Sequence, residues 1–180
     1  MLLLQFPEAP RDLTVPNARA RTYLYSVPLD AKASGFPDLR KRLLPVGDVE
    51  VRYWGGFAWG TRGLVFQRRA GVWSATKVMT RGGEKARRLP APKSGWPAFW
   101  RRAEGLGIWT LPDEAEIKDR KGYAKIFDGY STLVETQRKG MYRAYGYDNP
   151  THQTDWRYAK PMAALDRLIR AEFPGWQART

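Results

Sequence analysis

The chain has 180 residues, 43% of them hydrophobic and 13% aromatic, and its 31 Lys and Arg exceed its 18 Asp and Glu to give a formal net charge of +13. This length and apolar content are typical of a globular protein with a sizeable core, and they exclude a chain that is disordered throughout. Because the chain contains no Cys and one His, it excludes disulfide bonds, thiolate chemistry and zinc sites built from Cys and His.

Residues 1–22 predict an extended arm because three prolines interrupt them, and proline disfavours helix at its own position and at the preceding one. The apolar run of residues 1–4 is too short for a signal sequence or a membrane span. We therefore expect residues 23–177 to form a single domain without membrane insertion. The lack of Cys fits a reducing cytosol and equally a disulfide-free protein outside it, so the compartment stays open.

The domain is predicted to begin with a short strand at residues 23–27 and a short helix at residues 38–44. Apolar and polar residues alternate over residues 49–54, which is the period of a half-buried strand. Residues 64–68 and 72–79 then predict a hairpin, since a glycine at the turn supplies the positive φ that a tight turn needs. A glycine- and proline-containing loop follows at residues 80–95.

The rest of the chain predicts a helix, a second sheet section and a final helix. Pro97 suits the first turn of a helix, and two glycines suit its end. Three antiparallel strands are expected at residues 123–127, 132–138 and 141–147, joined by Asp-Gly and Lys-Gly turns. The final helix has one apolar stripe with helical spacing, formed by Met162, Leu165, Ile169 and Phe173.

This order of elements indicates an α+β fold built on antiparallel sheet. Runs of strands joined by hairpins, with helices between the runs, are typical of that class. We expect two three-stranded sections, each followed by a helix, with the helices packed on one side of the sheet.

From about residue 51 onward the chain resembles an uncharacterised family of small bacterial proteins. The resemblance consists of a basic hairpin, a Trp-x-x-Phe-Trp helix, a Gly-x-Trp-x-Leu-Pro segment, an Asp-Gly strand start with a later Glu, and an aromatic strand before a Pro. In this chain these motifs are Trp96 to Trp100, Gly107 to Pro112, Asp128-Gly129 with Glu135, and Tyr142 to Tyr145 with Pro150. Tyr130 and Ser131 depart from the family pattern, which has an aromatic residue closer to the Asp-Gly. The resemblance implies the layout of the elements and no activity.

Positive charge is concentrated in residues 51–102, where twelve Lys or Arg face one acid, Glu84, so that this window carries +11 of the net charge. Nine aromatic residues share the window. Such a charge density attracts anionic partners beyond contact distance. The simpler interpretation is a solvated basic face with its aromatics in the core. The candidate polyanion-binding residues are Arg52, Arg68, Arg69, Arg81, Arg87, Arg88, Arg101 and Arg102, with Trp54 and Trp59 as candidate aromatic contacts.

No residue pattern assigns catalysis, a metal or a cofactor. Asp128 and Glu135 form a conceivable acid–base pair, but Asp128 suits a turn and Glu135 suits a cross-strand pair with Arg143. His152 is the single histidine, and none of the serines lies in a nucleophile motif.

We therefore expect a non-enzymatic binding protein whose basic face engages an acidic protein partner or another polyanion, at most in the manner of an immunity protein or an inhibitor. One alternative is non-specific binding of nucleic acid, with phosphate contacts from arginine and base stacking on tryptophan. A third is a metal-independent hydrolase centred on His152 and Glu135. The oligomeric state stays open.

Overall fold

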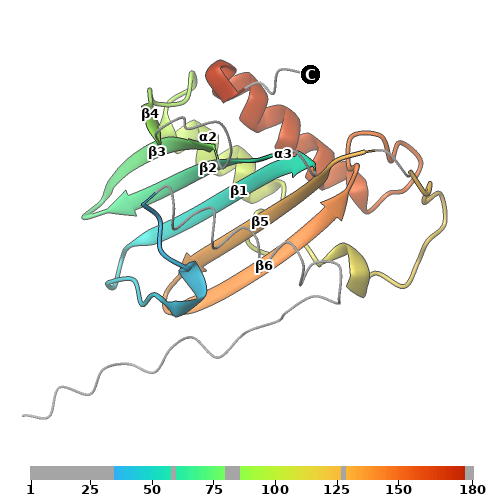
Figure 1. The fold of residues 1–180 in the computed structure, drawn as a ribbon, viewed down its shortest axis with the longest axis horizontal. Coiled ribbons are helices and arrows are strands. Elements are labelled where there is room, and N and C mark those ends of the chain that lie inside the picture. Colours follow the sequence, from blue (N-terminus) through green and yellow to red (C-terminus); the bar gives the residue numbers. More distant parts are fainter. Residues whose placement is uncertain (1–34, 58–59, 80–85, 127–128, 177–180) are drawn as a thin grey trace, which may run out of the picture.

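The computed structural model describes residues 35–57, 60–79, 86–126 and 129–176, which form a six-stranded antiparallel sheet with two α-helices (Figure 1). The strands lie in the order β4-β3-β2-β1-β5-β6. Their bounds are Val49–Phe57 for β1, Gly60–Arg69 for β2, Val72–Met79 for β3, Arg87–Leu89 for β4, Ser131–Arg138 for β5 and Met141–Asp148 for β6. The α+β fold with antiparallel sheet is thereby confirmed.

Two tight turns of the same kind lie at one end of this sheet. Ala70 and Gly71 join β2 to β3, and Lys139 and Gly140 join β5 to β6, all four with φ between 47° and 82°. Positive φ at both central residues matches the right-handed twist of the strands they connect. Strand β1 also begins here, because Val49 pairs with Arg68, one residue before the end of β2, and with Arg138, the last residue of β5. We call residues 41–50, 68–73 and 138–141 the hairpin end.

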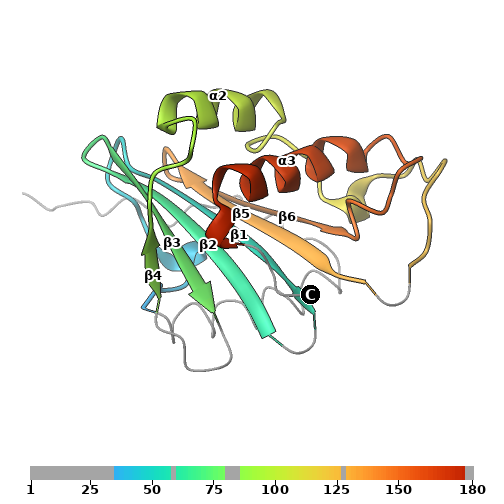
Figure 2. The same cartoon turned by 90° about the horizontal axis from the view of Figure 1, so that it is seen from above.

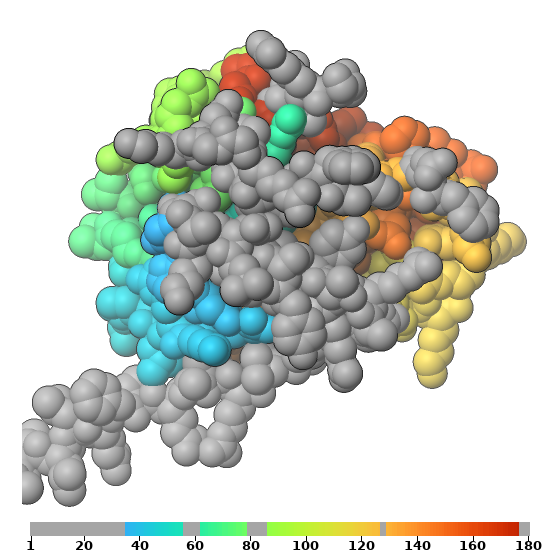
Figure 3. Space-filling view, viewed as in Figure 1, coloured from blue at the N-terminus to red at the C-terminus, as the bar shows by residue number. Residues whose placement is uncertain are grey.

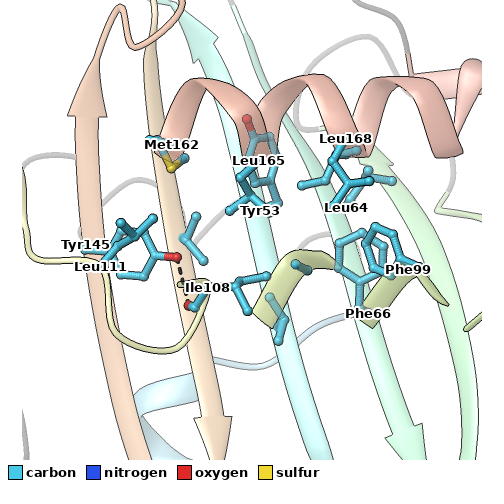
Figure 4. Packing of buried hydrophobic residues seen from close by; sticks show 14 of the residues in the cluster. Tyr53, Leu64, Phe66, Phe99, Ile108, Leu111, Tyr145, Met162, Leu165 and Leu168 are labelled. Carbon is cyan, nitrogen blue, oxygen red and sulfur yellow. Dashed lines mark hydrogen bonds between the residues drawn. The ribbon is translucent and has the colours of Figure 1, made fainter. Parts of the chain in front are cut away.

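Both helices, α2 (Trp96–Gly105) and α3 (Ala159–Glu172), cover the same face of the sheet (Figure 2). Proline occupies the first turn of α2, as its sequence predicts. The apolar stripe of α3 is buried in the core between the helices and the strands. Figure 4 shows Leu165 beside Tyr53 and Leu168 beside Leu64. This helix face of the sheet is the main hydrophobic core, and its burial is the dominant favourable contribution to folding.

The opposite face of the sheet carries a smaller apolar cluster among buried polar groups. The short 3-10 helix η1 (Leu39–Lys41) contributes Leu39, which is fully buried beside Trp54 and Val65. Asp38 caps this helix by accepting a hydrogen bond from the backbone N–H of Arg40. We call this face the network face, because its polar side chains bond to one another.

Three predicted elements differ from the structure. The expected helix at residues 38–44 is only the single turn of η1. The expected strand at residues 123–127 is wrong, since residues 123–126 are not in a strand. Tyr123 instead packs edge-on against Trp156, with ring centroids 5.0 Å apart. The predicted loop at residues 80–95 contains β4, which pairs with residues 75–77 of β3 and ends before Pro90, because proline lacks the N–H of a further ladder bond.

The predicted arm at residues 1–22 and the short strand at residues 23–27 lie outside the described residues. In the part of the chain that the structure describes, no helix is both long enough and apolar enough to cross a membrane.

Candidate functional site

Two of the candidate polyanion contacts lie in the interior. Arg52 is 1% exposed and donates from Nε to Glu50 at 2.8 Å and from Nη2 to the Pro37 carbonyl at 2.7 Å. Trp54 is also 1% exposed, and its Nε1 donates to Glu135 at 2.7 Å. A buried side chain with satisfied donors does not meet a partner in solution, so Arg52 and Trp54 are removed from the candidate face.

Glu50 is the centre of the network face. Its carboxylate is fully buried and bonds to Arg52, to Arg69 at 2.5 Å and to Gln67 at 2.9 Å. Arg42 completes the set at 3.4 Å. A buried charge is tolerated when ion pairs and hydrogen bonds replace its water, and Glu50 meets that condition. The candidate Arg69 therefore has an internal partner.

Glu135 occupies a second buried position on this face and does not pair with Arg143, so the predicted cross-strand pair is wrong. The register places Glu135 opposite Ala144, and its carboxylate accepts from Trp54 and from Tyr142 at 2.9 Å. Burial raises the pKa of Glu135, while Arg52 and the two hydrogen bonds oppose that rise. Arg143 instead donates to the Leu111 carbonyl.

The other candidate arginines are divided among separate elements. Arg102 on α2 is paired with Glu172 on α3, and Arg101 is exposed on α2. Arg87 and Arg88 are exposed on the edge strand β4. Arg81 and Trp59 lie outside the described residues. The candidate residues therefore do not gather on a single face within the described part of the chain.

A different cationic group forms at the hairpin end. Val49 pairs with Arg68 on one side and with Arg138 on the other, and these arginines pair in turn with Trp73 and Met141. The five residues thus lie in one row across five strands. Paired residues in antiparallel strands point to the same face, so this row shares the helix face with Val49.

Stacked indole rings stand above the row. Trp73 stacks on Trp100 with ring centroids 4.3 Å apart, and Trp100 stacks on Trp109 at 5.7 Å. The guanidinium of Arg138 lies over Trp109 at 4.2 Å, and that of Arg68 lies 5.7 Å from the Trp73 ring. Trp96 also stacks on Trp73, at 5.8 Å. Guanidinium groups are attracted to the negative face of an aromatic ring, so the stacked rings have a cation beside Trp73 and another over Trp109.

Exposed apolar side chains also gather at this end. Within the described residues, the large hydrophobic side chains that are exposed are Leu43, Val46, Val72 and Met141, and all four belong to the hairpin end. Figure 3 shows the segment before β1, in cyan, beside the β2–β3 hairpin, in green, on the left of the molecule. By the same pairing rule, Val72 shares the network face with Arg69 and Met141 shares the helix face with Arg138. The exposed apolar side chains therefore lie at one end of the sheet, on both of its faces.

The hairpin end carries a net positive charge. It contains six cations and two acids, which gives six minus two, or +4. Both acids face cations within it, since Asp48 lies 3.8 Å from Arg69 and Glu50 bonds to the same side chain. Among the described residues, no carboxylate pairs with Arg68, Arg138 or Lys139. Their charge is therefore not neutralised by a carboxylate of the described residues.

Sequence reasoning missed Trp109, Arg138, Lys139 and Met141 as surface residues, because they lie outside the basic window of residues 51–102. The available signal was the Lys-Gly turn, which predicts that its flanking residues share one end of the sheet with the other hairpin.

The residues of the hydrolase alternative have separate surroundings. His152 is exposed, with its ring 6.1 Å from that of Tyr130, whereas Glu135 is enclosed by Trp54 and Tyr142. Asp128 lies outside the described residues. In the described ranges, no three His, Cys, Asp or Glu side chains are grouped so that they could hold a metal ion.

Comparison of the chain with protein-family models, curated proteins and solved structures found no significant match.

Proposed function

We propose that this protein is a recognition module that binds an acidic partner protein through the hairpin end. The observation that carries the proposal is the coincidence of two features that are separate in the sequence. The exposed large apolar side chains of the described residues lie at the same end as a group of cations without carboxylate partners.

The composition of this surface supports a protein partner. Trp, Met and Arg are enriched in protein interfaces, where apolar contacts supply affinity and charges supply fast encounter and orientation. Met141 is 56% exposed beside Arg138 on the helix face and offers apolar area to a partner there. Arg68, Arg138 and Lys139 offer positive potential around it.

Base stacking is less well supported. A base needs a free aromatic face, but the indole faces at the hairpin end are stacked on one another and next to Arg68 and Arg138. Trp54 is buried. A nucleic acid would therefore have only phosphate contacts here, which are strongly weakened by salt.

The test compares two charge-matched double variants of the full chain. Arg68→Glu with Arg138→Glu changes the hairpin end, and Arg87→Glu with Arg88→Glu changes the edge strand β4 by the same charge. Binding to an immobilised random copolymer of glutamate and tyrosine, and to single-stranded DNA, is measured over a series of salt concentrations.

We expect the hairpin-end variant to lose about tenfold or more of its affinity for the copolymer, and the β4 variant to lose only the part due to the long-range field. Equal losses in the two variants would contradict the proposal. Tighter binding of the wild type to DNA than to the copolymer would support the nucleic-acid alternative instead.

A further inference from the structure

Arg138 differs from the other cations of the hairpin end in how its guanidinium is held. The centre of this guanidinium lies 4.2 Å from the centroid of the Trp109 ring. Within the described residues, the guanidinium forms no ion pair or hydrogen bond. A guanidinium carries five N–H donors in one plane. Because none of those of Arg138 is bonded within the described residues, a partner carboxylate can accept two of them.

The indole beneath Arg138 is itself fixed from two sides. Trp109 stacks on Trp100 with an interplanar angle of 18°, and its Nε1 donates to Glu104 at 3.0 Å. Arg138 is the last residue of β5, so its backbone is held by pairing with β1 and β6. A donor group that is already ordered loses less conformational entropy when it binds.

An exposed apolar side chain stands next to this guanidinium. The register pairs Arg138 with Met141 across the hairpin, and directly paired residues have Cβ atoms about 5 Å apart. Met141 is 56% exposed. Its flexible thioether side chain adapts to apolar surfaces of different shape.

The neighbouring cations lack this combination. Arg68 uses Nε and Nη2 to bond the Gly47 carbonyl at 3.2 and 2.8 Å, and Arg69 bonds to the buried Glu50. Lys139 is exposed in the turn and stacks on no ring among the described residues. It is a point charge of the same sign in the same hairpin, which makes it a matched control for Arg138.

We infer that Arg138 is the anchor for a carboxylate of the partner, and that the partner places a large apolar side chain beside that carboxylate, against Met141. This inference rests on the proposed function. It specifies the contact segment as an acidic and an apolar residue, in either order, on the same side, which means two positions apart in an extended chain or three to four in a helix.

The experiment uses short randomised peptides displayed on beads and sorted with the labelled full-length protein. The peptides captured by the wild type are then measured against Arg138→Lys, Arg138→Gln and Lys139→Gln by fluorescence anisotropy. Far-ultraviolet circular dichroism verifies that each variant is folded. In each captured peptide the acidic residue is also replaced by its amide, so that each pair of changes forms a double-mutant cycle.

We expect captured peptides to carry the acidic–apolar pair, and Arg138→Lys to lower their affinity about tenfold, because lysine keeps the charge and lacks the planar fork. Lys139→Gln should lower the affinity at most about threefold. Replacing the acidic residue of the peptide should remove the difference between wild type and Arg138→Lys.

Two results would overturn the inference while leaving the proposed function in place. One is equal affinity of wild type and Arg138→Lys, which would mean that charge alone matters. The other is an equal loss in Arg138→Gln and Lys139→Gln. If no acidic peptide is captured, or if capture is unchanged in the Arg68→Glu and Arg138→Glu double variant, the proposed function itself fails.

Discussion

The network face and the hairpin end both contain arginine and tryptophan, yet they use them in opposite ways. On the network face, Arg52 is enclosed and its charge is matched by Glu50. At the hairpin end, Arg138 rests on Trp109, and no carboxylate faces it within the described residues. The first arrangement is closed and contributes to the fold. The second leaves the guanidinium donors of Arg138 unbonded within the described residues and is suited to a partner.

The difference teaches that the density of positive charge along a chain does not identify a binding surface. A guanidinium that leaves water needs a carboxylate inside the protein, because an unpaired buried charge is very costly. A guanidinium that stays half in water can be oriented by an aromatic ring without losing its donors. The exposure of an arginine side chain, and not its position in a basic stretch of sequence, decides whether it stabilises the fold or can bind a partner.

The largest effect is expected for Arg52→Ala, which should destabilise the protein by about 3 kcal/mol because Glu50 loses its most buried partner. The free energy of unfolding is measured by urea titration. Arg88→Ala, which removes an exposed arginine, should change that free energy by less than about 0.5 kcal/mol. Similar values for the two variants would mean that the network face is not a closed ion-pair network.

A double replacement tests the same pair from the other side. Replacement of both partners, Arg52→Met combined with Glu50→Leu, leaves no unpaired buried charge at these two positions, so it should recover part of the stability that Arg52→Ala loses. Recovery stays partial because Arg69 and Gln67 lose their bond to Glu50.

The next largest loss of stability is expected at Gly63 on β2, where the absence of a side chain leaves room for the Trp54 ring of β1. A Cβ at Gly63 would lie 2.3 Å from the Trp54 ring, so Gly63→Ala should destabilise by about 2 kcal/mol through overpacking. Gly55→Ala is the matched control in the adjacent strand, because its Cβ would meet nothing closer than 4.0 Å. Thermal unfolding compares them, and a shift of equal size in both variants would contradict the prediction.

The pH dependence of stability should reflect Glu135. Its pKa is raised by burial above the ordinary value of 4.5, so the folded state binds the proton more tightly than the unfolded state. The stabilisation from this proton is therefore complete below about pH 4.5 and is lost as the pH rises through the folded pKa.

Glu135→Gln cannot ionise, while its amide oxygen still accepts the hydrogen bond of Trp54. We expect the stability of this variant relative to wild type to increase with pH over that window, measured by urea unfolding at several pH values. A difference that does not change with pH would show that Glu135 does not titrate differently in the two states.

The smallest effect is expected at the hairpin end. Arg138→Gln should lower stability by about 0.5 kcal/mol, since a partly exposed cation over an indole contributes little. A double-mutant cycle with Trp109→Leu isolates this pair. A loss as large as that of Arg52→Ala would mean that Arg138 serves the fold, which would remove the contrast between the two regions.

Much of the fold follows from local patterns in the chain. The Arg69-Ala70-Gly71 and Lys139-Gly140 turns, the proline in the first turn of α2 and the apolar stripe of α3 each predicted their element correctly. Each of these signals involves neighbours within a few residues. The false strand at residues 123–127 shows the limit, since Tyr123 packs on Trp156 rather than in the sheet.

The candidate site could not be located in the same way. Arg68 and Arg138 are 70 positions apart in the chain and become neighbours in one row only because both of their strands pair with β1. The prediction of Arg52 and Trp54 as surface contacts failed for a related reason. Strand alternation places them on the face opposite the main core, but it does not indicate whether that face is covered.

By itself, the sequence determined the antiparallel α+β class, the tight hairpins and the excess of positive charge, because turn chemistry, side-chain period and composition are local properties. Only the tertiary structure decided which arginines lie opposite a buried carboxylate and which lie over an indole at the hairpin end. Those partners come from distant strands, and the strength of a charge's interactions depends on the burial that strand pairing and packing create.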